Sequence, residues 1–191
     1  MTHHDLLILG DVSKDIIITP ENVEKAIGGA VVYSAVALKH LGANILAVTK
    51  LNPEDRQALE VFDRHGVPYR FLESPTTTSI RNTYHTADRD RRTCEAIGMV
   101  APFTLDDVPD DVTAEVYYLG GLMKGEFPEA FVLAMTERGK VAIDAQGFMR
   151  VNENGPMVFR DWDRTREVIR AVHYLKTDHA EAETLTGKSD R

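Results

Sequence analysis

The chain has 191 residues, 43% of them hydrophobic, and a formal net charge of −8 from 22 basic and 30 acidic side chains. This length suits one α/β domain, and the hydrophobic share is large enough for a substantial core. The acidic balance argues against nucleic acid and an anionic membrane as main partners.

No apolar run reaches the roughly 18 residues that span a bilayer, and the first ten residues lack the design of a signal peptide. Cys94 is the only cysteine, which excludes an intrachain disulfide and favours a reducing compartment. We therefore expect a cytoplasmic protein with no membrane partner.

The first part of the chain alternates predicted strands and helices. Apolar runs at 6–9, 44–48 and 68–72 predict buried strands, and the segments 29–41 and 53–65 predict helices. This order is typical of a parallel sheet covered by helices. We therefore predict the α/β fold class, with a parallel sheet and helices on both of its faces.

A polar stretch at 76–86 then interrupts this order. Its alternation places Ser79, Arg81, Thr83 and His85 on one face of a strand, and Ile80, Asn82 and Tyr84 on the other. The segment 93–97 can pair back as a hairpin, and the charged turn between them, at 88–92, is interpreted as a solvated tip. Together with an early strand at 15–19, this hairpin is predicted to form a small accessory sheet that closes over a ligand or contacts a second chain.

The α/β order returns in the last part of the chain. Strands are predicted at 116–119, 141–144 and 173–175, and helices at 127–138 and 162–172. A final helix is expected from Asp178 to about Leu185, and Glu181 stands where a capping box requires it.

Two glycines, Gly28 and Gly29, open the helix predicted at 29–41. Glycines let a ligand or another backbone come close, and the free N–H groups of a helix start can donate to hydroxyls or anions. Because few residues of this helix are polar, we expect it to be buried on nearly all sides. The glycines can also serve only to begin the helix.

Asp144 and Gln146 follow the strand predicted at 141–144. In open parallel sheets, ligands collect outside the carboxyl ends of the strands. The two residues are therefore candidates for the wall of a substrate site, although Asp144 can equally be a buried structural acid. Arg150 could reach a phosphate, or it could be an ordinary surface arginine.

The order of several short motifs carries a resemblance. Gly10 and Asp15 follow the first strand with the spacing Gly-x-x-x-x-Asp, and Gly28 and Gly29 open an Ala-rich helix. Late in the chain, an Asp-x-x-Glu segment (178–181) comes before a Leu-Thr-Gly segment (185–187). These motifs, in this order over essentially the whole chain, resemble those of the PfkB carbohydrate kinases, the family that includes ribokinase. The segments around Gly28, Ile80 and Gln146 look most like a subgroup of archaeal-type inositol and nucleoside kinases.

The resemblance implies a role for each of these residues. Asp15 would bind substrate hydroxyls, because a carboxylate can accept two hydrogen bonds from a diol, and Gly28 and Gly29 would lie against the substrate. Asp178 and Glu181 would organise Mg²⁺ and phosphates through water rather than as direct metal ligands. Read without the resemblance, Asp15 is a turn cap and Glu181 belongs to a capping box.

The family resemblance further implies a ribokinase-like domain over residues 1–191, with lid strands near 15–19 and 76–97. It implies ATP and Mg²⁺ as cofactors and a small sugar, polyol or nucleoside as substrate. Arg81, on the hairpin, is a candidate substrate contact. A homodimer, or another chain that covers the open edge of the sheet, is the expected assembly.

The chain also departs from the family pattern. Tyr33 stands where many members have asparagine, which predicts a different substrate selectivity. Asp178 replaces an asparagine and adds a negative charge near the expected phosphates. No Gly-Ala-Gly-Asp segment, which holds the family's catalytic base and anion hole, occurs in the sequence.

We therefore expect no catalytic residue within this chain and an incomplete domain without its carboxy-terminal part. Loss of the base and the anion hole removes the main sources of rate acceleration. Two functions remain open: a kinase of which this is the amino-terminal part, inactive alone, or a non-catalytic polyol-binding or assembly protein on the same fold.

Overall fold

The computed structural model describes residues 1–86, 92–153, 155–162 and 164–189. Its core is a six-stranded parallel sheet with the strand order β12-β9-β8-β1-β4-β5. The strands are β1 (Thr2–Leu9), β4 (Ile45–Leu51), β5 (Tyr69–Glu73), β8 (Val112–Leu119), β9 (Lys140–Asp144) and β12 (Tyr174–Lys176).

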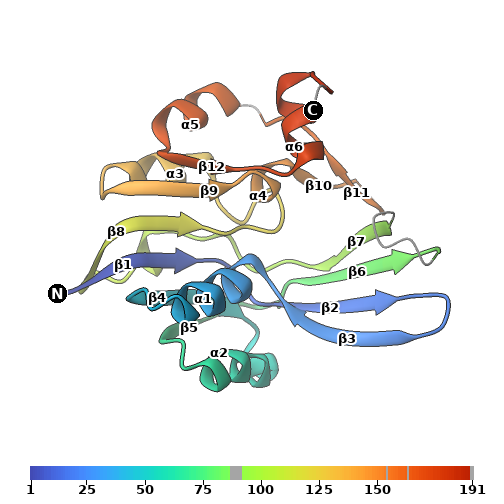
Figure 1. Ribbon diagram of the computed structural model, residues 1–191, viewed down its shortest axis with the longest axis horizontal. Helices are drawn as coiled ribbons and strands as arrows, with labels where there is room; N and C mark the ends of the chain where they lie inside the picture. The colour runs from blue at the N-terminus through green and yellow to red at the C-terminus, as the bar shows by residue number, and fades with distance from the viewer. Residues whose placement is uncertain (87–91, 154, 163, 190–191) are drawn as a thin grey trace.

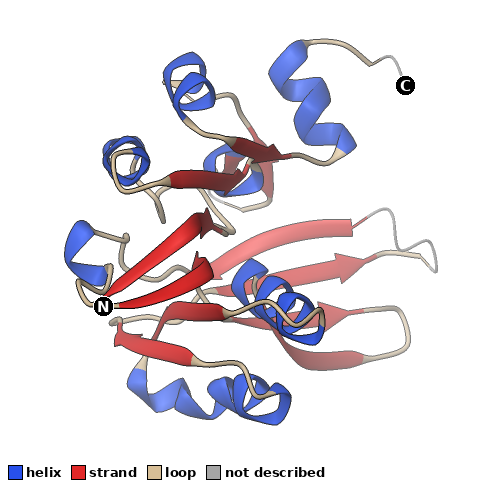
Figure 2. Cartoon of the chain, turned by 60° about the vertical axis from the view of Figure 1, so that its left-hand side comes forward, coloured by secondary structure: helices blue, strands red, loops and turns tan. Residues whose placement is uncertain are grey.

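Both faces of this sheet are buried, which explains the continuous apolar runs in its strands. Leu7 and Leu9 of β1 point into one hydrophobic cluster, whereas Ile8 points into the other. The first cluster includes residues of α3 (Glu129–Thr136) and α5 (Thr165–Ala171). The second includes residues of α1 (Ala30–His40), the 3₁₀ helix η1 (Pro53–Leu59) and α2 (Glu60–His65). Figure 2 shows these helices on both sides of the strands, as the α/β prediction requires.

A second sheet of four strands, which we call the lid, projects from one end of the core (Figure 1). Its order is β3-β2-β6-β7, with β2 (Ser13–Ile18), β3 (Val23–Gly28), β6 (Ser79–Tyr84) and β7 (Arg92–Gly98). The early strand pairs in parallel with the predicted hairpin, Ile17 opposite Asn82. The predicted accessory sheet is therefore confirmed.

The remaining elements are short. They are η2 (Leu105–Asp107), α4 (Gln146–Met149), the hairpin of β10 (Arg150–Asn152) and β11 (Met157–Phe159), and α6 (His179–Thr186). The Asp178 side chain caps α6, and the reciprocal bond from its backbone N–H to Glu181 completes the predicted capping box. Within the described ranges, no helix is long and apolar enough to cross a membrane.

The expectation that α1 is buried on nearly all sides is wrong. Only Val31, Val32 and Ala35 are buried, and Tyr33 is 67% exposed. The helix lies on one face of the sheet, so that its other side meets no packed layer. Ala37, for example, is a small apolar residue on that other side and is exposed, so an apolar residue type does not by itself indicate a buried position.

Other differences arise where local sequence gives little signal. The strand β3 was not predicted, because its polar residues Glu24 and Lys25 lie on an exposed edge of the lid. The helix predicted at 53–65 is split into η1 and α2, a boundary that no glycine or proline marks. The charged tip predicted at 88–92 lies outside the described residues except for Arg92, which belongs to β7.

A buried lysine fastens the loop around η2 to the core sheet. The Lys50 ammonium donates to Asp107 Oδ2 at 2.7 Å and to the Pro102 carbonyl at 2.8 Å. We expect Lys50→Met to cost about 2 kcal/mol of unfolding free energy, because it leaves Asp107 without its buried partner. The control is Lys14→Met, which breaks the more exposed pair with Asp55 and should cost less than about 1 kcal/mol. Equal midpoints of urea unfolding for the two variants would contradict this assignment.

Candidate active site

A cavity of about 490 Å³ lies between the lid and the carboxyl ends of the core strands. Such a volume can enclose a small molecule. Its walls come from β2, β6 and β7 of the lid, from the first turns of α1, from the carboxyl ends of β8, β9 and β12, and from the loops that follow β8 and β9. The residues that line it include Ser13, Asp15, Gly29, Tyr33, Asn82, Tyr84, Arg92, Tyr118, Asp144, Gln146, Arg150 and Lys176.

Asp15 lies on β2 at the lid side of this cavity, beside Gly28. A Cβ atom at Gly28 would lie 3.0 Å from Asp15 Oδ2 and 3.1 Å from Ser13 Oγ. Gly28 therefore leaves the space that the carboxylate occupies, although it is not itself part of the wall. Burial raises the pKa of Asp15 above its ordinary value, while the charges of Arg92 and Arg150 act in the opposite direction.

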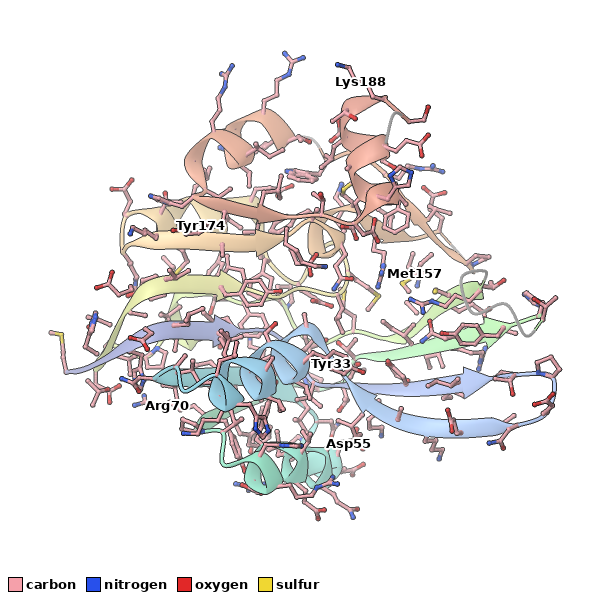
Figure 3. All side chains as sticks on the ribbon, in the orientation of Figure 1. Tyr33, Asp55, Arg70, Met157, Tyr174 and Lys188 are labelled. Atoms are coloured by element: carbon pink, nitrogen blue, oxygen red, sulfur yellow. The ribbon has the colours of Figure 1, made fainter. Side chains whose placement is uncertain are left out.

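Gly29 joins β3 to α1 in a backbone conformation that other residues rarely adopt, with φ of 113°. A Cβ atom there would lie 2.3 Å from the carbonyl oxygen of Asp11. The first turn of α1 thus reaches the cavity, and its amide groups have no partner within the helix. Tyr33 lies on this turn, toward the lid (Figure 3), and its hydroxyl is 3.5 Å from the Cβ position of Gly28.

Asp144 lies at the end of β9, on the opposite side of the cavity. Its Oδ2 accepts a hydrogen bond of 2.8 Å from Lys176, and only 2% of the residue is exposed. The charge of Asp144 and, more strongly, burial raise the pKa of Tyr118 to about 12. The Tyr118 phenol therefore stays protonated at neutral pH and can donate a hydrogen bond.

Gln146 is held in place by two neighbouring loops. Its Nε2 donates to the Gly121 carbonyl at 3.1 Å. This bond is possible because Gly147 packs directly on Gly121: a Cβ atom at Gly147 would lie 2.8 Å from the Gly121 Cα atom. The loops after β8 and β9 thus form one continuous wall.

Asp178 and Glu181 do not line the cavity. Both take part in the capping box, and Glu181 is buried with 1% exposure. Burial raises the pKa of Glu181, and the charges of Asp178 and Asp144 raise it further, whereas the hydrogen bond with the Asp178 backbone and the charge of Lys176 act in the opposite direction. The two acids therefore lie near the Asp144 end of the cavity, and their part in holding Mg²⁺ and phosphates stays a prediction. Over the described ranges, no group of three or more histidine, cysteine or acidic side chains has the arrangement of a metal site.

Arg81 is placed away from the cavity, so the structure does not support the predicted substrate contact. Its side chain pairs with Glu95 at 3.3 Å on the other face of the lid. The alternation in β6 was predicted correctly, but Asn82 and Tyr84 are the residues that face the cavity. Nothing in the sequence indicated which of the two faces would meet the core.

Several cavity residues were missed or left open by sequence reasoning. Arg92 was assigned to a solvated tip, but it lines the cavity and donates to the Tyr84 hydroxyl at 2.9 Å. Arg150, left open between a phosphate contact and a surface residue, is half-buried in the wall. Lys176 could have been found, since it ends the strand next to β9 and parallel strands end at one edge of a sheet.

These features define an α/β protein with a cavity between a β-sheet lid and the core, lined by carboxylates and cationic side chains. Comparison with known proteins identifies the family to which this protein belongs. The family described as pfkB family carbohydrate kinase matches residues 5–191, and the chain therefore belongs to this family.

Solved structures of kinases have the same fold. A sulfate complex of a pyrophosphate-dependent kinase in the ribokinase family is 36% identical with a TM-score of 0.90, and this chain covers 66% of it. The pyrophosphate-dependent kinase complexed with a pyrophosphate analog and myo-inositol is 35% identical with a TM-score of 0.89, and 65% of it is covered. Of the present chain, 97% is matched in both cases. No curated protein sequence matched significantly. The chain thus spans just under two thirds of the length of these kinases.

Proposed function

We propose that the protein is part of a kinase that transfers a phosphoryl group to a hydroxyl of a cyclitol such as myo-inositol. The observation that carries the proposal is the Asp15 carboxylate, which lies in the lidded cavity next to Gly28 and the Tyr33 hydroxyl. A carboxylate that accepts two hydrogen bonds suits adjacent ring hydroxyls. The kinase bound to myo-inositol, at 35% identity, supports the same substrate class.

The cationic side chains suit the other half of the reaction. Arg92, Arg150 and Lys176 line the cavity, and cations stabilise the charge that develops on phosphoryl oxygens. We expected ATP as the donor, but the relatives at 34–36% identity are described as pyrophosphate-dependent. We therefore propose pyrophosphate as the donor and keep ATP as the alternative, each with Mg²⁺ placed near Asp178 and Glu181.

The second candidate function is polyol binding without catalysis. The Gly-Ala-Gly-Asp segment that supplies the base and the anion hole in the family this chain resembles does not occur within residues 1–191. We propose that these 191 residues alone bind a polyol but do not turn it over at a useful rate.

Two measurements on the purified chain and on any longer product of its gene separate these readings. Calorimetry gives the affinity for myo-inositol, and a coupled assay gives phosphate transfer from pyrophosphate and from ATP to inositol, sugars and nucleosides. Turnover only in the longer product supports the kinase, and binding without turnover in both supports the alternative. Absence of binding to any polyol contradicts both.

We also propose that a second copy of the chain covers the outer face of the lid. This face carries exposed apolar side chains: Val23 is 64% exposed, Ile27 37% and Ile97 48%. Exposed apolar patches of this kind mark interaction sites. We expect Ile27→Asp to turn a dimer into a monomer in light scattering after size exclusion, with Ile97→Asp as a second probe and Glu21→Lys, at the exposed turn before β3, as the control. A wild-type protein that is monomeric at all concentrations contradicts the proposal.

A further inference from the structure

Two acidic side chains that the site does not use are completely buried beneath the cavity. Asp11 follows β1 and Glu126 follows β8, and these strands are neighbours in the core sheet. Both residues are 0% exposed. The carboxyl groups therefore meet in the interior, where an isolated negative charge is costly.

Most oxygen atoms of the two carboxyl groups lack a hydrogen-bond donor. Glu126 Oε2 accepts the Leu122 N–H at 2.7 Å. Glu126 Oε1 and both carboxylate oxygens of Asp11 have no donor in good geometry, although the two side chains lie in hydrogen-bonding contact. Two ionised carboxylates would face each other as acceptors only, whereas one proton on either of them supplies the missing donor.

The surroundings favour that proton. Burial and the charge of Asp15 favour the protonated form, whereas hydrogen bonds from the Thr78 side chain and from the backbone of Asp11, Leu122 and Met123 favour the ionised form. No lysine, arginine or histidine of the described chain is among them. With no cation to offset a second negative charge, a singly protonated pair is the form that burial permits.

The pair also lies where the lid joins the core. The Asp11 carbonyl touches Gly29 at the start of α1, and Asp11 itself is two residues before β2. Thr78 is the residue before β6. Leu122, whose N–H binds Glu126, lines the cavity. A bond between Asp11 and Glu126 thus connects the root of the lid to the cavity floor.

We propose that Asp11 and Glu126 share one proton and that this bond holds the root of the lid against the cavity floor, so that both are positioning residues for Asp15 and Leu122. Loss of the proton places two charges against each other and releases this connection. For its effect on affinity the inference rests on the proposed function, but its effect on stability does not.

The direction of the pH dependence follows from burial, which raises the pKa of both acids, and the charge of Asp11 raises the pKa of Glu126 further. A raised folded-state pKa gives stability that is complete below the unfolded-state pKa and is lost as pH rises through the folded-state value. The lid connection is therefore intact in acid solution and weakens as pH rises through the raised pKa of the pair.

Glu126→Gln tests the shared proton directly. The amide that this variant introduces donates to Asp11 as the proton does, keeps an oxygen for the Leu122 N–H, and gives the pair the same total charge as its protonated form. We expect wild-type and E126Q melting temperatures to agree most closely in acid, near the ordinary pKa of a glutamate, and to separate by about 3 °C or more as pH rises through the raised pKa of the pair, with E126Q higher. The affinity of the wild type for myo-inositol should fall about tenfold over this range, and that of E126Q less than about twofold.

Two further variants complete the experiment. Asp11→Asn is the reciprocal test if E126Q does not fold, and Glu73→Gln, an exposed acid at the end of β5, should follow the wild type at every pH. Parallel pH profiles for wild type and E126Q overturn the proposal. So does a melting temperature that rises with Na⁺, K⁺ or Mg²⁺ in the wild type but not in E126Q, because a cation then replaces the proton. If no variant binds myo-inositol, the proposed function fails while the melting curves still decide the pair.

Discussion

Asp15→Ala is expected to weaken myo-inositol binding by about 100-fold or more, because each hydrogen bond from a hydroxyl to a buried charge contributes about 1.5–3 kcal/mol. The melting temperature should change little or rise. Burial raises the pKa of Asp15, so the folded protein holds this carboxylate ionised at a cost. Removing the carboxylate removes that cost together with the ligand contact.

Asp15→Asn separates charge from shape in this prediction. The amide keeps the volume beside Gly28 but accepts fewer hydrogen bonds, and we expect an affinity between those of the wild type and D15A. Since the ionised form binds, wild-type affinity should fall as pH drops through the raised pKa of Asp15, and D15N should show no such fall. Titration calorimetry on both variants measures these effects. A large drop in melting temperature with unchanged affinity would mean that Asp15 only supports the packing of the lid.

The core of the fold could be predicted because its signals are local. Buried parallel strands such as β4 consist mostly of apolar residues. The capping box of α6 is formed by Asp178 and Glu181, and their spacing is visible in the sequence. The lid could be predicted in part, since the alternation of β6 is clear even though the sequence is polar. β3 was invisible because an exposed edge strand needs no apolar residues.

The site was harder to predict than the fold, because it depends on which face of each strand meets the core. The lid residues that were chosen from the sequence included Arg81, but the cavity uses Asn82, one position further along. Asp11 and Glu126 lie far apart in the sequence and carry no motif. Only the parallel pairing of β1 with β8 brings them together. That pairing belongs to the tertiary structure, and the local sequence does not show it.

Gly29→Ala is expected to cost about 3 kcal/mol or more of unfolding free energy and to lower the melting temperature by about 6–12 °C. Two effects add. The φ of 113° disfavours any side chain, and the new Cβ atom would lie 2.3 Å from the Asp11 carbonyl oxygen. Since that oxygen belongs to the backbone, the start of α1 or the root of the lid must shift to make room. Affinity for myo-inositol should fall as well, because the first turn of α1 forms part of the wall.

Two other glycines make the controls for this prediction. Gly42 has φ of 84° and no atom within 4 Å of its Cβ position, so Gly42→Ala carries only the backbone cost of about 1 kcal/mol. Gly28→Ala has an ordinary φ but meets the Asp15 side chain, and it should reduce affinity more than stability. The order of destabilisation is therefore Gly29 first, then Gly42 and Gly28, as measured by urea unfolding. If G29A is no less stable than G42A, the tight contact between Gly29 and Asp11 does not exist. That result would also contradict a rigid junction between the lid and the core at this point.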